Sequence, residues 1–140
     1  MKLIREAMNS RVKLAHPQDI VADAAAVMSN LDIGMLPVTE GDRVVGAITD
    51  RDIVVRGVAD NMDLAKTRVG DLMTKDVDVC YEDQDIDEVA RRMMQNKIRR
   101  VVVVNREEQL AGVISLGDLT AHTTTATSGK VLREVSRSNE

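Results

Sequence analysis

The chain has 140 residues, and its 19 lysine and arginine residues against 23 aspartate and glutamate residues give a formal net charge of −4. An apolar fraction of 44% and a charged fraction of 30% are typical of a globular protein, either one domain or two small joined halves. A membrane-spanning chain is excluded because apolar stretches such as residues 101–104 fall far short of the roughly 20 residues of a span. The mild acidity argues against nucleic-acid binding, which requires phosphates to be neutralised.

The first half of the chain predicts elements in the order β-α-β-β-α after a short apolar turn. The helix is indicated by apolar side chains that recur at helical spacing, and the last two strands form a hairpin around the turn signal Glu40-Gly41-Asp42. The turn, the strand, the helix, the two hairpin strands and the last helix are predicted at residues 3–8, 12–15, 20–30, 35–39, 43–49 and 50–58.

The second half predicts the same elements in the same order. They follow a polar linker within residues 57–68, and a tail rich in threonine and serine comes after them, with a weak helical pattern near its end. The turn, the strand, the helix, the hairpin strands and the last helix are predicted at residues 69–73, 77–80, 86–96, 100–105, 109–115 and 116–123.

The two halves are copies of one unit. Nine residues are identical at a shift of 65 residues, which becomes 66 after one extra residue in the second hairpin turn, where chance gives about three. Met8, Val12, Ala25, Met28, Ile33 and Val38 recur 65 residues later, and Gly46, Ile48 and Asp52 recur 66 residues later. The sequence therefore predicts a first repeat at residues 1–59, a linker at 60–68, a second repeat at 69–123 and a flexible or partner-docking tail at 124–140.

A half of about 60 residues is marginally stable alone, so the two are expected to pack together. The predicted fold class is α/β (α+β), with two β-α-β-β-α repeats packed sheet to sheet in pseudo-two-fold symmetry. Such packing leaves two symmetric clefts between the repeats, and these are the places where a ligand is expected.

Two matching motifs carry a resemblance to a known family. They are Gly46-Ala47-Ile48-Thr49-Asp50-Arg51-Asp52 and Gly112-Val113-Ile114-Ser115-Leu116-Gly117-Asp118. With these motifs and the segment at residues 32–38, the chain resembles a pair of CBS domains, or Bateman module, named after cystathionine β-synthase. The resemblance covers about residues 4–122, and the chain is similar to small stand-alone bacterial CBS-pair proteins.

The resemblance implies an adenosine nucleotide at these motifs, and their chemistry fits one. The hydroxyls of Thr49 and Ser115 lie at predicted helix starts, where unpaired N–H groups favour a phosphate. Asp52 and Asp118, one turn further on, offer carboxylates that can accept both hydroxyls of a ribose. By carry-over from the family, adenine is expected against the backbone of the first strands, including Lys13, Leu14, Val77 and Val79.

Basic residues near the motifs are further candidates. CBS sequences resembling this one often carry a phosphate-binding basic residue at the position of Arg100, while the matching residue of the first repeat is Met35. Arg99 either joins it or, with Arg100, balances nearby acidic residues in solvent. Arg51 either clamps a phosphate or covers the helix end.

The same motif spacing has a purely structural interpretation. Each Thr/Ser-x-x-Asp unit also matches a helix capping box, which stabilises a helix start by about 0.5–2 kcal/mol without any ligand. Cys80 matches Ala15 and is expected to be a buried small side chain, and one cysteine excludes an internal disulfide. Metal ligation by His16 or His122 is not expected, for lack of partner ligands.

No catalytic role is predicted, because the chain has neither a Walker loop nor a dinucleotide glycine fingerprint nor a nucleophile with an obvious base. The favoured hypothesis is a cytoplasmic regulatory homodimer that binds AMP, ADP, ATP or an NAD-like ligand between its repeats, requires no cofactor and acts on an unidentified target protein. The alternatives are a ligand-free interaction scaffold and a module responding to S-adenosylmethionine or a metal. The cytoplasmic expectation rests on residues 1–6, which lack a long apolar core, and the dimer on the apolar side chains of the last helices, Ile53, Val54, Val55 and Leu119.

Overall fold

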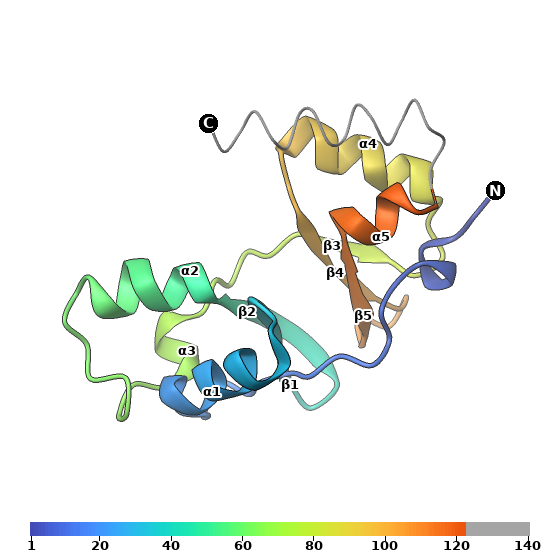
Figure 1. Ribbon diagram of the computed structural model, residues 1–140. Helices are drawn as coiled ribbons and strands as arrows, with labels where there is room; N and C mark the ends of the chain where they lie inside the picture. The colour runs from blue at the N-terminus through green and yellow to red at the C-terminus, as the bar shows by residue number, and fades with distance from the viewer. Residues whose placement is uncertain (123–140) are drawn as a thin grey trace. The chain divides into compact units, whose positions relative to one another are not determined.

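The structure is a computed structural model, and it describes residues 1–122 of the chain. The described residues form two compact units: one consists of residues 12–77, and the other joins residues 1–11 to residues 78–122. Each unit is a small sheet with helices beside it (Figure 1). The predicted tail, residues 124–140, lies outside the described part.

The unit of residues 12–77 is built on a two-stranded antiparallel sheet of β1 and β2 with a bulge between Val38 and Thr39. Helix α1 has alanine, valine and methionine at helical spacing on its buried face, and its side chains pack into the core against the sheet. The elements are α1 (Val21–Leu31), β1 (Met35–Glu40), β2 (Arg43–Thr49), α2 (Asp50–Asp52), the π-helical continuation η2 (Ile53–Val58) and α3 (Val69–Leu72).

The other unit has a three-stranded sheet in the order β3-β4-β5, with β3 parallel to β4 and β4 antiparallel to β5. The parallel pair is joined through α4, as parallel strands require a crossover. The elements are η1 (Ile4–Glu6), β3 (Val79–Tyr81), α4 (Ile86–Asn96), β4 (Arg100–Val104), β5 (Leu110–Ser115) and α5 (Leu116–Thr120).

The segment that opens each repeat packs into the unit of the other repeat. Ile4, in η1, is fully buried in the core around α4, and Val69, in α3, is fully buried in the core around α1. Shortly after η1 in the chain, the backbone of Asn9 exchanges two hydrogen bonds with Val113 of β5. Shortly after α3, the backbone of Thr74 exchanges two hydrogen bonds with Ala47 of β2.

Most predicted elements are confirmed within a residue or two, and the α+β class with them. The strand predicted at residues 12–15 is wrong. Ala15 alone makes a β-bridge, to Val38, while Lys13 and Leu14 are exposed and pair with no neighbouring strand in the described residues. The predicted linker is held against its unit, where Met62 and Leu64 pack on the core. Within residues 1–122, every helix is too short or too polar to span a bilayer.

Candidate functional site

Each motif forms a capping box where a strand of the hairpin runs into a helix. Thr49 ends β2, and its Oγ1 accepts a hydrogen bond of 3.0 Å from the N–H of Asp52. The Asp52 Oδ2 accepts one of 3.1 Å from the N–H of Thr49. Ser115 and Asp118 repeat this exchange at the end of β5, with distances of 3.3 and 2.9 Å. The capping geometry of the structural interpretation is therefore present at both motifs.

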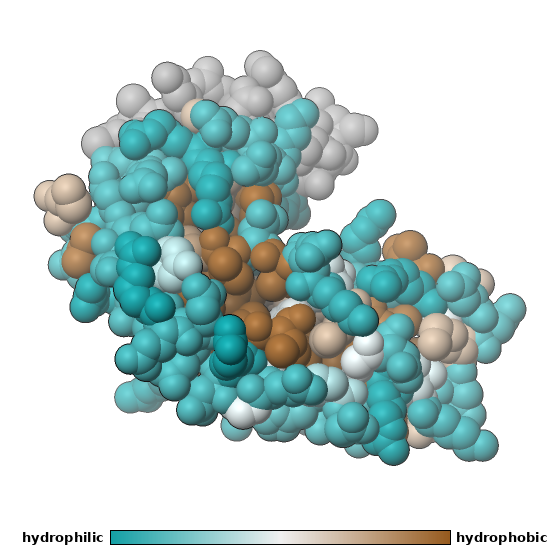
Figure 2. Space-filling view, turned by 180° about the vertical axis from the view of Figure 1, so that it is seen from behind, coloured by the Kyte–Doolittle hydropathy of each residue, from teal (hydrophilic) through white to brown (hydrophobic). Residues whose placement is uncertain are grey.

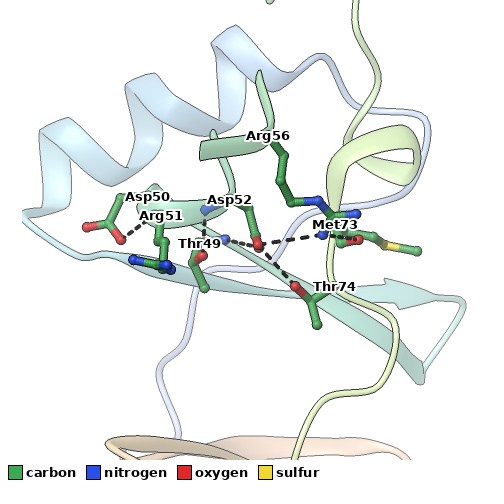
Figure 3. A network of polar contacts seen from close by, with 7 residues as sticks. All are labelled: Thr49, Asp50, Arg51, Asp52, Arg56, Met73 and Thr74. Carbon is green, nitrogen blue, oxygen red and sulfur yellow. Dashed lines mark hydrogen bonds and ion pairs between the residues drawn. The ribbon is translucent and has the colours of Figure 1, made fainter. Parts of the chain in front are cut away.

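The first motif belongs to a larger polar network (Figure 3). Asp52 is only 8% exposed, and its Oδ1 accepts a hydrogen bond of 3.1 Å from Thr74 Oγ1. The Arg56 Nη1 lies 3.7 Å from the same oxygen and also donates to the carbonyl of Met73 at 3.4 Å. Both oxygens of the Asp52 carboxylate are thus engaged by groups of the same unit.

The second motif has a smaller set of contacts. Asp118 is half-buried, and its Oδ2 accepts from both the N–H and the Oγ of Ser115, at 2.9 and 3.0 Å. Among residues 1–122 these bonds leave Oδ1 of Asp118 without a hydrogen-bond partner. This oxygen is an acceptor at the start of α5 that a ligand can use.

The sheets bring the basic candidates to the second motif. Arg100 is the Cα partner of Ser115 in the β4–β5 ladder, and the carbonyl of Arg99 accepts the N–H of Leu116 at 2.9 Å. Both arginines are exposed. In the unit of residues 12–77, Met35 pairs with Thr49 in the same register, so a thioether stands where the other unit has a guanidinium.

The remaining predicted site residues are spread over the two units. Lys13 and Leu14 precede the Ala15 bridge in the unit of residues 12–77, which ends at Val77. Val79 begins β3 in the other unit, on the same sheet as Ser115. Figure 3 shows the exposed Arg51 pointing toward Asp50 and away from the carboxylate of Asp52.

Sequence reasoning missed Arg56 and Thr74. Arg56 stands four residues after Asp52, a spacing that favours an ion pair on a helix and that could have identified it. Thr74 gave no signal, because its contact with Asp52 depends on the close approach of residues 73–74 to β2. Arg56, Met73 and Thr74 also line a hollow of about 550 Å³, and none of the predicted site residues lines it.

Cys80 is buried, and both histidines contact other groups of the chain. Cys80 is fully buried in β3, and burial raises the pKa of its thiol to about 11. The His16 ring hydrogen-bonds the carbonyl of Thr39 at 3.0 Å, and His122 Nδ1 lies 3.4 Å from Lys2 Nζ. Within residues 1–122 no three His, Cys, Asp or Glu side chains are grouped as metal ligands.

The apolar residues expected at a dimer face divide into two sets. Ile53 and Leu119 are buried in the cores of their own units, which removes them from any such face. Val54, Val55 and Val58 of η2 are 58%, 47% and 56% exposed. On the face seen in Figure 2 most of the surface is hydrophilic, with brown apolar areas interrupting it.

Comparison with known proteins matches both repeats to one family model, the CBS domain, at residues 4–58 and 69–123. Protein YlbB of Bacillus subtilis is 32% identical over 139 residues, which are 97% of this chain and 93% of that protein. Hypoxic response protein 1 of Mycobacterium tuberculosis is 32% identical over 87% of this chain and 85% of its own.

Two solved structures share the fold. That of hypoxic response protein 1, with two coordinated zinc ions, has a TM-score of 0.77 at 31% identity and covers 88% of this chain and 100% of that one. The CBS domain pair of protein MJ0100, in complex with 5′-methylthioadenosine and S-adenosyl-L-methionine, has a TM-score of 0.74 at 26% identity, over 86% and 98% of the two chains.

Proposed function

The chain belongs to the CBS-domain family, with two CBS domains in 140 residues, and on that premise we propose that it is a regulatory module, without catalysis of its own, that binds an adenosine nucleotide. The observation that carries the proposal is the second motif: no hydrogen bond within residues 1–122 uses Oδ1 of Asp118, and Arg100 stands next to Ser115 in the ladder. The CBS pair of MJ0100, a similar chain, was solved with two ligands that both contain adenosine.

Each group of the second motif has a defined role toward the ligand. Asp118 Oδ1 accepts the two ribose hydroxyls, since a carboxylate oxygen carries more than one acceptor position. Arg100 is exposed and permanently charged, so it meets the phosphate. Val79 offers backbone groups of β3 to the adenine, as the family resemblance implies. AMP, ADP, ATP and NAD all present this sugar-phosphate.

We also propose that the module is a homodimer. The support is the row of exposed valines on η2, Val54, Val55 and Val58, since apolar side chains gathered on one helix favour burial against a partner. Light scattering of the wild type should give twice the chain mass, and Val54→Lys with Val58→Lys should reduce it to that of one chain. A wild type that stays at one chain mass contradicts the dimer.

Titration calorimetry with AMP tests the ligand. Asp118→Asn should weaken AMP binding about ten- to hundredfold, since hydrogen bonds to a charged group contribute about 1.5–3 kcal/mol. Asp60→Asn removes an exposed carboxylate that belongs to neither motif and is the control. Arg100→Met should weaken AMP but leave adenosine unchanged, which separates the phosphate from the ribose contacts.

The rival interpretation is a scaffold that binds a partner protein without a ligand. It predicts no heat of binding with AMP, ATP, NAD or S-adenosylmethionine and no shift of the melting temperature. It also predicts a purified protein without adenine absorbance, which is readily seen because the chain has one tyrosine and no tryptophan. Those results together would overturn the proposal.

A further inference from the structure

We infer that the two motifs are not equivalent: Arg56 and Thr74 form a latch that keeps the first motif closed to ligand, so the chain binds one adenosine ligand, at the second motif. The inference rests on the proposed function and adds its stoichiometry and the residues that set it. The latch consists of the contacts of these two side chains with Asp52.

The latch occupies the acceptor that a ribose needs. Thr49 N–H already uses Oδ2 of Asp52, and Thr74 Oγ1 uses Oδ1 at 3.1 Å, with the Arg56 guanidinium 3.7 Å away. A ribose must therefore displace Thr74 before it can donate to Asp52. Asp52 as a whole is also only 8% exposed, so little of the residue meets solvent.

Thr74 is held in place by its backbone. Its N–H and carbonyl exchange hydrogen bonds of 2.9 and 3.0 Å with Ala47 of β2. The strand can come this close because residue 46 is glycine: a Cβ there would lie 2.5 Å from the Thr74 carbonyl oxygen. The hydroxyl that closes the latch is thus fixed to the same sheet as the motif.

The second motif has the same backbone but lacks the latch. Asn9 takes the place of Thr74, exchanging backbone bonds of 2.9 and 3.0 Å with Val113, but its Oδ1 accepts the N–H of Arg11 at 3.0 Å. His122 takes the place of Arg56, four residues after Asp118, and its Nδ1 lies beside Lys2 Nζ. Among residues 1–122, the Asp118 carboxylate is consequently bonded to Ser115 alone.

Exchange of residues between the repeats supplies matched variants. Thr74→Asn with Arg56→His gives the first motif the side chains of the second, and Asn9→Thr with His122→Arg does the reverse. Both pairs place residues that already occur on the same backbone in the other unit. Arg91→Met, which removes an exposed cation on α4, is the control for loss of charge.

Calorimetric titration with AMP measures the number of sites per chain. We expect one site in the wild type and in Arg91→Met, and two in the Thr74→Asn, Arg56→His variant, with the second lost when Asp52→Asn is added. The Asn9→Thr, His122→Arg variant should bind AMP at least tenfold more weakly. Thermal unfolding of each variant confirms that it is folded.

The outcomes separate this inference from the proposed function. A wild type with two sites, one lost in Asp52→Asn and one in Asp118→Asn, overturns the latch and leaves the function standing. A folded Thr74→Asn, Arg56→His variant that still has one site also overturns the latch. Absence of AMP, ATP, NAD and S-adenosylmethionine binding in every variant overturns the proposed function, and the latch with it.

Discussion

Gly46 and the carbonyl oxygen of Thr74 lie so close that a Cβ on Gly46 would be 2.5 Å from that oxygen, and Gly112 has the same relationship with Asn9. Real Cβ atoms do not approach backbone oxygens this closely, so the segment behind α3 would have to move away from β2. The glycine of each motif is therefore required for packing and not for a turn.

Gly46→Ala should lower the free energy of unfolding by about 1–3 kcal/mol, since an added methyl group in a tightly packed place forces a backbone shift. Gly117→Ala is the matched control, because the nearest contact of a Cβ there within residues 1–122 would be Ser115 Oγ at 3.8 Å, an ordinary van der Waals distance. Urea unfolding measures both. Equal stabilities of the two variants would contradict the close approach.

Thr39→Val should stabilise the protein by about 1 kcal/mol. Thr39 is 1% exposed, and within the described residues its Oγ1 is buried without a hydrogen-bond partner, which is costly. The other repeat carries Val104 at the matching place. Thr67→Val is the control of opposite sign, because Thr67 Oγ1 donates to the Asp63 carbonyl at 2.8 Å. A loss of stability in Thr39→Val would show that its hydroxyl is bonded.

Stability should decline above about pH 9 because of Cys80. Burial raises the pKa of its thiol from 9.0 to about 11 in the folded protein. Between these values the unfolded chain loses the thiol proton and the native chain keeps it. The free energy of unfolding therefore falls by up to about 1.4 kcal/mol per pH unit. The loss of stability from pH 9 to 10.5 should be smaller in Cys80→Ala, which has the alanine found at this place in the other repeat. Wild type and variant curves of unfolding free energy against pH that run parallel would contradict this.

The sequence predicted the elements best where periodicity was strong. The helix at residues 86–96 is confirmed to the residue, because its apolar and charged positions alternate at helical spacing. The strand predicted at residues 12–15 was wrong because four residues alone do not reveal whether a ladder partner exists beside them. The repeat alignment also left hidden that η1 and α3 each pack with the other repeat, since equivalence in sequence does not specify a packing partner.

The site was predictable in its chemistry but not in its surroundings. The motif spacing gave both capping boxes, which the structure contains. The contact of Thr74 with Asp52 arises from chain segments that tertiary packing brings together, whereas the Asn9 side chain is bonded locally to the N–H of Arg11. They make Asp52 and Asp118 different, although the two aspartates occupy identical places in the repeat.

A crystal structure of the full chain grown with AMP tests the central claim most directly. We expect the ribose hydroxyls within hydrogen-bond distance of Asp118 Oδ1, the phosphate at the Arg100 guanidinium, and Thr74 still bonded to Asp52. Nucleotide density at Asp52 alone, or at a place that touches neither aspartate, would contradict the account.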